Sequence, residues 1–515
     1  MNAMQLPVVG PEIVVGLVGA TGTDLERVAE AVEGSLVTVS YKGTVIHLSR
    51  HLSEIAGLVK AGATDEYERL KHHMDGGDRF RETLQAADAM ARLGLARIRG
   101  EREAATGDKN TPSNRRAYIL RSLKHPREVQ TLRAVYGSSF ILLGAYCPRA
   151  RRVESLSQRI AASRHELNRT DFRAKAEELI CRDESGLAGA TGTRREYGQN
   201  VRETFPLSDV FINAAEPAAL EVELRRFIQL WFGFPFETPT KDEFGMFHAQ
   251  AAALRSASLA RQVGAAICSK RGELLAVGCN DVPRPGGGLY WSGDPDDNRD
   301  HILRYDTSDA MKRTVLEDIV DRLMGLTPEG RMTGEEIREF VKETLEGDEA
   351  PLIKEARLMK LIEFSRSVHA EMAALTEAAK RGVPIEGSTL YTTTFPCHDC
   401  ARHLIAAGVG RVVYVEPYPK SLAAELYEKE IALDPESAGD GSRVCFQPFV
   451  GVAPRAYMTL FQMEKRKEVD GSVVRWQGGI AAPKQAAGVD YLLRETLQLA
   501  DFDSALQSRS ITLTE

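Results

Sequence analysis

The stretch His369-Ala370-Glu371, followed 25 residues after Glu371 by Pro396-Cys397-His398-Asp399-Cys400, predicts both the fold and the chemistry of this chain. A catalytic zinc ion takes three protein ligands in tetrahedral geometry and leaves the fourth position for water. One imidazole and two thiolates, with a carboxylate close to the imidazole, fit that arrangement. We therefore expect His369, Cys397 and Cys400 to bind one zinc ion per chain, with Glu371 as the proton shuttle.

This set of residues suits hydrolysis. Zinc lowers the pKa of a bound water to about 7, and a neighbouring carboxylate can move protons from water to a ring nitrogen and then to a departing amine. The pattern H-x-E followed by P-C-x-x-C is typical of enzymes that attack C4 of cytosine or C6 of adenine. The alternatives are a redox Cys pair or a structural zinc knuckle, which would need a fourth ligand such as His398 or His403. We interpret those two residues as surface or packing residues.

The residues around these motifs predict alternating strands and helices. Apolar runs and turn residues place two strands before the motifs, and each ligand group then lies at the start of a helix. Exposed amides at helix N-termini stabilise thiolates. The pattern favours a three-layer α/β/α domain with strands at residues 261–268, 273–280, 388–393 and 411–416 and helices at residues 369–380 and 397–407.

On these residues the chain resembles the deoxycytidylate deaminase branch of the cytidine deaminase superfamily. The matching stretches are RQVGA at 261–265, VGCN at 277–280, HAE at 369–371 and LYT at 390–392 leading into PCHDC at 396–400. More narrowly, GGGLYW at 286–291, EPYPKS at 416–421 and PFVG at 448–451 look like the bacterial anti-phage dCTP deaminases. This resemblance implies deamination of dCTP, dCMP or both, which depletes deoxycytidine nucleotides during infection. It also implies a homo-oligomer.

The resemblance also implies residues that contact the substrate. Asn280 resembles the asparagine that contacts the nucleotide sugar, and the amide of Ala370 resembles the donor to the pyrimidine carbonyl. The alternative for Asn280 is a turn residue before Pro283. Residues 284–366 form an insertion that begins as a loop and continues as helices at 309–324 and 334–345. Within it, Tyr290, Trp291 and His301 either cover the base or pack in the core.

The first part of the chain predicts a separate, doubly wound α/β domain. Residues 13–18 read as a buried strand, 19–23 as a glycine loop and 24–32 as a helix, which resembles the phosphate-binding start of P-loop nucleotide kinases. The candidate nucleotide-binding residues are Gly16, Gly19, Gly22 and Thr23. No lysine follows Gly22, so we expect a regulatory domain that binds a nucleotide or another ligand without phosphoryl transfer; the alternative is a glycine turn used only for packing.

The alternation of strands and helices continues through a basic turn at residues 149–152, which either grips phosphate or is a solvated turn. Pro235 and Pro239 mark a boundary near residue 238. We therefore expect a P-loop kinase-like regulatory domain over residues 1–238 and a deaminase-like domain over residues 239–515.

Composition narrows the function classes. The net charge of the 515 residues is −7, which disfavours general nucleic-acid binding. The alternative function, deamination of a base in single-stranded DNA or RNA, calls for a basic track with stacking aromatic residues. No apolar run approaches the roughly 18 residues of a membrane helix, and no signal peptide opens the sequence. Seven cysteines, an odd number, favour a reducing cytoplasm.

Overall fold

The computed structural model describes residues 10–55, 57–166, 168–185, 196–326, 330–347, 350, 353, 356–418, 421–433, 441–463, 465–485 and 488–509. The chain forms two compact units. Unit 1 combines residues up to Glu243 with those from Val450 onwards, and unit 2 runs from Phe244 to Phe449. The sequence predicts that the second domain continues to residue 515, whereas in the structure the segment from Val450 onwards belongs to unit 1.

Unit 1 is built on a six-stranded sheet in the order β12-β5-β4-β1-β3-β2. Its strands run parallel except for β12, which pairs antiparallel with β5 and is supplied by the returning C-terminal segment. The bounds are β1 Ile13–Val18, β2 Lys42–His47, β3 Arg116–Arg121, β4 Phe140–Tyr146, β5 Val210–Asn213 and β12 Gly451–Val452.

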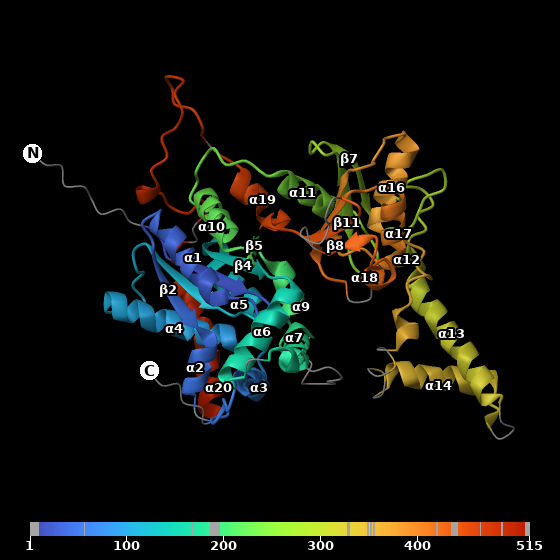
Figure 1. The fold of residues 1–515 in the computed structure, drawn as a ribbon, viewed down its shortest axis with the longest axis horizontal. Helices are drawn as coiled ribbons and strands as arrows, with labels where there is room; N and C mark the ends of the chain where they lie inside the picture. The colour runs from blue at the N-terminus through green and yellow to red at the C-terminus, as the bar shows by residue number, and fades with distance from the viewer. Residues whose placement is uncertain are drawn as a thin grey trace, which may run out of the picture. The chain divides into compact units, whose positions relative to one another are not determined.

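Helices pack on both faces of this sheet (Figure 1). Several begin with an N-cap side chain, such as Asp24 before α1 and Asp65 before α3, each of which accepts from a backbone amide of its helix. The bounds are α1 Leu25–Val37, α2 Leu48–Glu54, α3 Glu66–Leu84, α4 Ala89–Thr106, α5 Pro126–Tyr136, α6 Arg149–Ser163, α7 Arg173–Ser185, α9 Val201–Thr204, α10 Pro217–Trp231, α19 Pro454–Phe461 and α20 Tyr491–Ser508.

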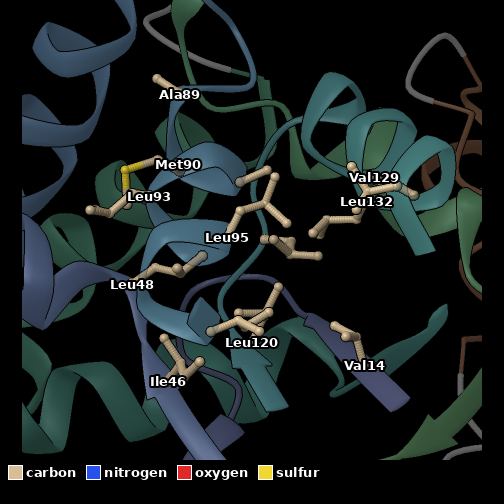
Figure 2. Packing of buried hydrophobic residues seen from close by; sticks show 14 of the residues in the cluster. Val14, Ile46, Leu48, Ala89, Met90, Leu93, Leu95, Leu120, Val129 and Leu132 are labelled. Atoms are coloured by element: carbon tan, nitrogen blue, oxygen red, sulfur yellow. The ribbon is translucent and has the colours of Figure 1, made fainter. Parts of the chain in front are cut away.

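Two hydrophobic cores lie on opposite faces of the unit 1 sheet. Val14 and Val18 of β1 belong to the core under α4, α5 and α20, part of which Figure 2 shows from close by. Ile13, Val15 and Leu17 belong to the core under α1 and α10. Because successive side chains of a strand point to opposite faces, a strand covered on both sides has to be apolar throughout. This explains why residues 13–18 were recognisable as a strand.

A buried ion network joins the C-terminal helix to the rest of unit 1. Arg102 of α4 donates to Glu495 of α20 (Nη1 to Oε2, 2.7 Å) and to Glu12, which precedes β1 (Nε to Oε1, 3.0 Å). All three side chains are essentially inaccessible to solvent. Three tyrosine hydroxyls donate to the same carboxylates: Tyr118 and Tyr491 to Glu12, and Tyr136 to Glu495. Removing a partner from such a network leaves a buried charge without compensation.

Replacement of Arg102 by Met should therefore destabilise unit 1 by about 3–5 kcal/mol. The two buried carboxylates would then lack the guanidinium that compensates their charge. Urea unfolding followed by the fluorescence of buried Trp231 measures the loss of stability.

Arg99→Met is the matched control for this change. Arg99 also lies on α4 and also reaches α20, but it donates to the neutral hydroxyl of Thr496 at 2.7 Å. Its replacement should cost about 1 kcal/mol. An Arg102→Met deficit equal to that of Arg99→Met would contradict the assignment of the network as charge-compensated.

Unit 2 contains a second six-stranded sheet in the order β10-β11-β9-β8-β6-β7. The pairs among β8, β9, β11 and β10 are parallel, and β6 is antiparallel to both of its neighbours. The strand bounds are β6 Gly264–Cys268, β7 Leu274–Cys279, β8 Thr389–Thr394, β9 Arg411–Glu416, β10 Ile431–Ala432 and β11 Val444–Pro448. The helix bounds are α11 Lys241–Ala253, α12 Asp300–Leu303, α13 Thr307–Met324, α14 Gly334–Glu346, α16 Ala370–Arg381, α17 His398–Ala406 and α18 Ala423–Leu426.

Unit 2 has the three layers predicted from the sequence. A Cβ at Gly264 of β6 would overlap the backbone of α11, whereas a Cβ at Gly278 of β7 would overlap the backbone of α16. Ala265 lies on the opposite face from Gly264 and packs in the core under α16. The sheet is therefore covered by α11 on one side and by α16 on the other, and glycine at these two positions permits the close approach.

The insertion contributes helices α12, α13 and α14. The last two pack on each other through a small cluster of their own that includes Val320, Ile337 and Val341. Both lie within about two residues of the helices predicted at 309–324 and 334–345. None of the helices in the described part of the chain has both the length and the apolar character needed to cross a bilayer.

Candidate metal centre and glycine loop

The predicted zinc ligands lie at the starts of two helices of unit 2. His369 is the N-cap of α16, and Cys397 is the N-cap of α17, with its sulfur accepting from the amide of Cys400 at 3.4 Å. The chain enters α16 from a short bridge in which the amide of Val368 donates to the carbonyl of Asp281. Since β7 ends at Cys279, this bridge fixes the start of α16 against the sheet.

The three ligand side chains converge. His369 Nδ1 lies 3.2 Å from Cys397 Sγ and 3.4 Å from Cys400 Sγ. Their ligand atoms all lie within 4.8 Å of one another, and no other His, Cys, Asp or Glu of the described residues joins the group. One imidazole nitrogen and two thiols are a donor set that suits zinc and leaves one tetrahedral position open. His398 and His403 are not part of the group, as the sequence predicts.

In the metal-free group, two of the three side chains hold protons that a bound metal would displace. The hydrogen bond with Cys400, together with that from His369, lowers the pKa of the Cys397 thiol to about 4. The hydrogen bond with Cys397 raises the pKa of His369 to about 9, and the Cys397 sulfur and burial raise that of Cys400 well above its ordinary value. Without metal, the trio therefore holds one thiolate, one imidazolium and one thiol at neutral pH.

Glu371 lies beside this group in the first turn of α16. Its Oε2 is 3.5 Å from Cys400 Sγ, and only 4% of the residue is exposed. Burial raises the pKa of its carboxyl to about 7, with a further contribution from Cys397. A carboxyl group with a pKa near neutrality can both accept and release a proton under the same conditions.

The two predicted substrate contacts differ in their surroundings. The amide of Ala370 occupies the first position of α16, where an amide has no acceptor within the helix. The side chain of Asn280 instead bonds to backbone: its Oδ1 accepts from the amide of Val263 at 2.7 Å and its Nδ2 donates to the carbonyl of Arg261 at 2.8 Å. This geometry makes Asn280 a residue that positions the segment before β6.

Arg261 and Tyr418 lie near the metal centre, and the sequence predicts no separate role for either residue. Burial, with a contribution from Cys397, raises the pKa of the Tyr418 hydroxyl. The guanidinium of Arg261 lies over the Tyr418 ring at 5.6 Å and pairs with Glu416 at 2.9 Å. The signal was present, since the stretches at 261–265 and 416–421 carried the resemblance; Pro419 and Lys420 of the second stretch lie outside the described residues.

Of the three residues of the insertion that could cover the base, one is buried and two are exposed. Tyr290 is buried at 6% exposure, whereas Trp291 is 58% exposed and stacks under the guanidinium of Arg255 at 3.5 Å. His301 is exposed in α12. Core packing therefore accounts for Tyr290, and the covering role stays a prediction for the other two.

Comparison with known proteins supports the interpretation of this region. Residues 239–416 match the family described as "Cytidine and deoxycytidylate deaminase zinc-binding region". This part of the chain is deoxycytidylate deaminase-like.

Curated relatives match over short segments. ComE operon protein 2 of Bacillus subtilis is 41% identical over 66 residues, or 13% of this chain and 35% of the relative. The deoxycytidylate deaminase of Enterobacteria phage T2 is 44% identical over 54 residues, or 10% of this chain and 29% of the relative. The chain thus spans about a third of the length of these relatives.

Among solved structures, the dCMP deaminase of cyanophage S-TIM5 in complex with dCMP and dUMP aligns with 42% of this chain and 100% of its own, with 19% identity and a TM-score of 0.22.

The glycine loop of unit 1 joins β1 to α1. Gly19, Gly22 and Thr23 line a cavity there, and Gly22 has a positive φ of 94°. Gly16 lies inside β1 rather than in the loop, and a Cβ at this position would lie 2.7 Å from Leu123 and 3.0 Å from Phe140. Close packing therefore accounts for Gly16.

A lysine does reach this loop, from the end of β3. Lys124 Nζ donates to the carbonyl of Gly19 at 3.0 Å and lies 2.9 Å from a carboxylate oxygen of Asp183, which is fully buried. The basic turn at residues 149–152 forms the first turn of α6. There Arg152 packs under Gly22 and pairs with Glu184 at 3.0 Å.

Zinc binding to the metal-free protein should release about two protons at pH 7, since His369 and Cys400 hold protons that the ligand forms lack. Calorimetric zinc titrations in buffers of different ionisation enthalpy count them. Cys397→Ala should lose the bound zinc, whereas Glu371→Gln and Cys445→Ala, a buried thiol outside the group, should keep it. Full zinc occupancy in Cys397→Ala, or zinc binding without proton release, would contradict the assignment.

Proposed function

We propose that the protein is a zinc-dependent hydrolase that deaminates deoxycytidine nucleotides, converting dCTP, dCMP or both to the uracil nucleotides. The observation that supports this most directly is the group of His369, Cys397 and Cys400 with the buried carboxyl of Glu371 beside it. A structural zinc site would have no use for a buried carboxyl group beside its ligands. The related segments of deoxycytidylate deaminases support cytosine as the base.

In this proposal the chain holds the reacting atoms and moves protons. Zinc, when bound, supplies the Lewis acid that makes hydroxide available at neutral pH. Glu371 accepts the proton of water and delivers it to N3 of the pyrimidine as the C4–O bond forms. It then takes the remaining hydroxyl proton to the amine as the C4–N bond breaks, so that cytosine and water become uracil and ammonia. The amide of Ala370 is the proposed donor to the pyrimidine carbonyl.

Glu371→Gln should lower kcat for deamination by about 10²- to 10⁴-fold while zinc stays bound, because the amide can neither accept nor deliver the proton. Glu377→Gln is the control, since Glu377 lies on the same helix but is ion-paired with Lys380 at the surface. Chromatography of products from dCMP, the four dNTPs and single-stranded DNA measures both activity and substrate class. Near-normal turnover in Glu371→Gln would contradict the mechanism, and faster deamination of DNA than of free nucleotide would favour base editing instead.

We infer a role in anti-phage defence from the family that the chain resembles. Depletion of deoxycytidine nucleotides would starve phage DNA synthesis. In infected cells that express the protein, dCTP and dCMP pools should fall in the wild type and not in Glu371→Gln. Equal pools in the two strains during infection would count against the defence role.

We also propose that unit 1 is a regulatory unit that binds a ligand and restrains the deaminase without phosphoryl transfer. Lys124 supports this, because its ammonium is paired with Asp183 and therefore poorly placed to stabilise charge on a transferring phosphate. Purified protein should show no nucleotide-dependent phosphate transfer or release above that of Lys124→Met. Bulky replacement of Gly19 or Gly22 should alter regulation in cells while the purified deaminase keeps its activity.

A further inference from the structure

A cavity of about 500 Å³ opens in unit 1 where β1, β2 and β3 end. The glycine loop forms one wall, and residues from the starts or faces of α2, α3, α6 and α7 form the others. In open parallel sheets, ligands bind outside the carboxyl ends of the strands, at the point where successive connections leave in opposite directions. Here β1 lies between β3 and β4, so the chain crosses β1 on its way between those two strands. The cavity lies at this edge and has the size of a small-molecule site.

The rim of the cavity is rich in guanidinium groups. Arg69 and Arg159 share one carboxylate, Glu66, and Arg121 pairs with Glu26. The group also includes Arg50, which is exposed and lies near His47, whose pKa is lowered by burial and by the charge of Arg50. The rim cations are Arg50, Arg69, Arg121 and Arg159. Since these guanidinium groups outnumber the two carboxylates, the rim suits an anion with more than one negative charge.

The cavity wall also contains polar atoms that lack a partner. Gln199 is only 8% exposed, and its Oε1 has no hydrogen-bond partner among the described residues. The hydroxyl of Thr23 is likewise buried and unpaired within that part of the chain. Both residues line the cavity. Buried polar atoms are almost always paired in folded proteins, so these two indicate groups that a ligand would satisfy.

The anion position of the glycine loop is filled by a side chain of unit 1 itself. The amide of Thr21 donates to Oδ2 of Asp183 at 2.6 Å, and Lys124 Nζ lies 2.9 Å and 3.0 Å from the two carboxylate oxygens. A backbone amide at the start of a helix together with an ammonium group is what binds a phosphate at such loops. Asp183 therefore stands where a phosphate oxygen would bind, and the rim arginines remain for a ligand.

We propose that this cavity binds a nucleoside triphosphate, with its phosphate chain on Arg50, Arg69, Arg121 and Arg159, and that Asp183 competes with the ligand for the loop amide and Lys124. The nucleoside lies over the apolar part of the wall, where Leu48, Leu70 and Met90 are found, with Gln199 as a polar contact. This inference rests on the ligand-binding role proposed for unit 1 and not on the deaminase activity.

Calorimetric titration of the full-length protein with ATP, GTP and dTTP tests the site without using cytidine nucleotides. One saturable site per chain is expected, and Arg121→Gln or Arg159→Gln should weaken binding about tenfold by removing charge-assisted contacts. Arg97→Gln is the matched control: Arg97 pairs with Glu54 at 20% and 44% exposure, close to the 24% and 47% of Arg121 and Glu26, and lies outside the cavity. Equal affinities in all three variants would overturn the proposal.

Inorganic tripolyphosphate distinguishes the two parts of the ligand. It should bind the same site more weakly than the nucleotides, and binding as tight as theirs would overturn the assignment of a nucleoside. Asp183→Asn should tighten nucleotide binding several-fold because the competing charge is gone. Weaker or unchanged binding in that variant would overturn the competition.

The outcome separates this inference from the proposed function. Titrations in Glu371→Gln should give the wild-type affinity. Absence of nucleotide binding in a protein that deaminates deoxycytidine nucleotides would overturn the inference alone. Nucleotide binding in a protein without deaminase activity would overturn the deaminase proposal alone.

Discussion

The proposed chemistry depends on one constraint, which is that two helices of unit 2 begin at the same point of the sheet. A histidine and two cysteines that are about thirty residues apart in sequence become ligands of one ion only because α16 and α17 start side by side. The sheet enforces this: α16 follows the bridge between Asp281 and Val368, and α17 follows β8, which pairs with β6. Helix N-termini also lower the cost of thiolates, so the same geometry that gathers the ligands favours their charged form.

Charge compensation plays the equivalent part in unit 1. Glu12 and Arg102 come from the first fifth of the described chain and Glu495 from near its end, and each is fully buried because the others are present. The covering helix α20 and the edge strand β12 make the returning segment part of the fold of unit 1. Glu243 strengthens this return, since it is buried, pairs with Arg226 and accepts from the amide of Val452 at 2.8 Å. Within unit 1, Glu243 therefore holds together the segment that leads into unit 2 and the segment that returns from it.

The sequence predicts elements whose signal is local. Strands β1 and β9 have the predicted bounds. A strand buried on both faces is a continuous apolar run and is therefore easy to predict. The candidate metal ligands are recognisable because their spacing is short and their residue types are rare. In contrast, β2 is a half-exposed edge strand, Lys42–His47, without an apolar run, and it was not predicted. Lys124, Asp183 and Glu495 acquire their roles from partners more than fifty residues away, which no local pattern can indicate.

The return of the C-terminal segment to unit 1 could not be predicted for the same reason. Its assignment rests on long-range contacts, such as the pairing of β12 with β5 and the burial of Glu495 against Arg102. The contact of Asn280 with a nucleotide sugar stays a prediction. In the structure its side-chain amide bonds on both sides to the backbone of the segment before β6.

The two candidate sites use the same backbone device with opposite charges. In unit 2 the amide of Cys400 donates to the sulfur of Cys397, and in the proposed zinc site a cation would complete this anionic side chain. In unit 1 the amide of Thr21 donates to Asp183, so a carboxylate of unit 1 occupies the anion-binding position of the loop. Because Asp183 neutralises Lys124, the uncompensated positive charge of the cavity lies on the arginines of the rim. In the proposed complex, a ligand of unit 1 is therefore held by side chains that come from four different elements.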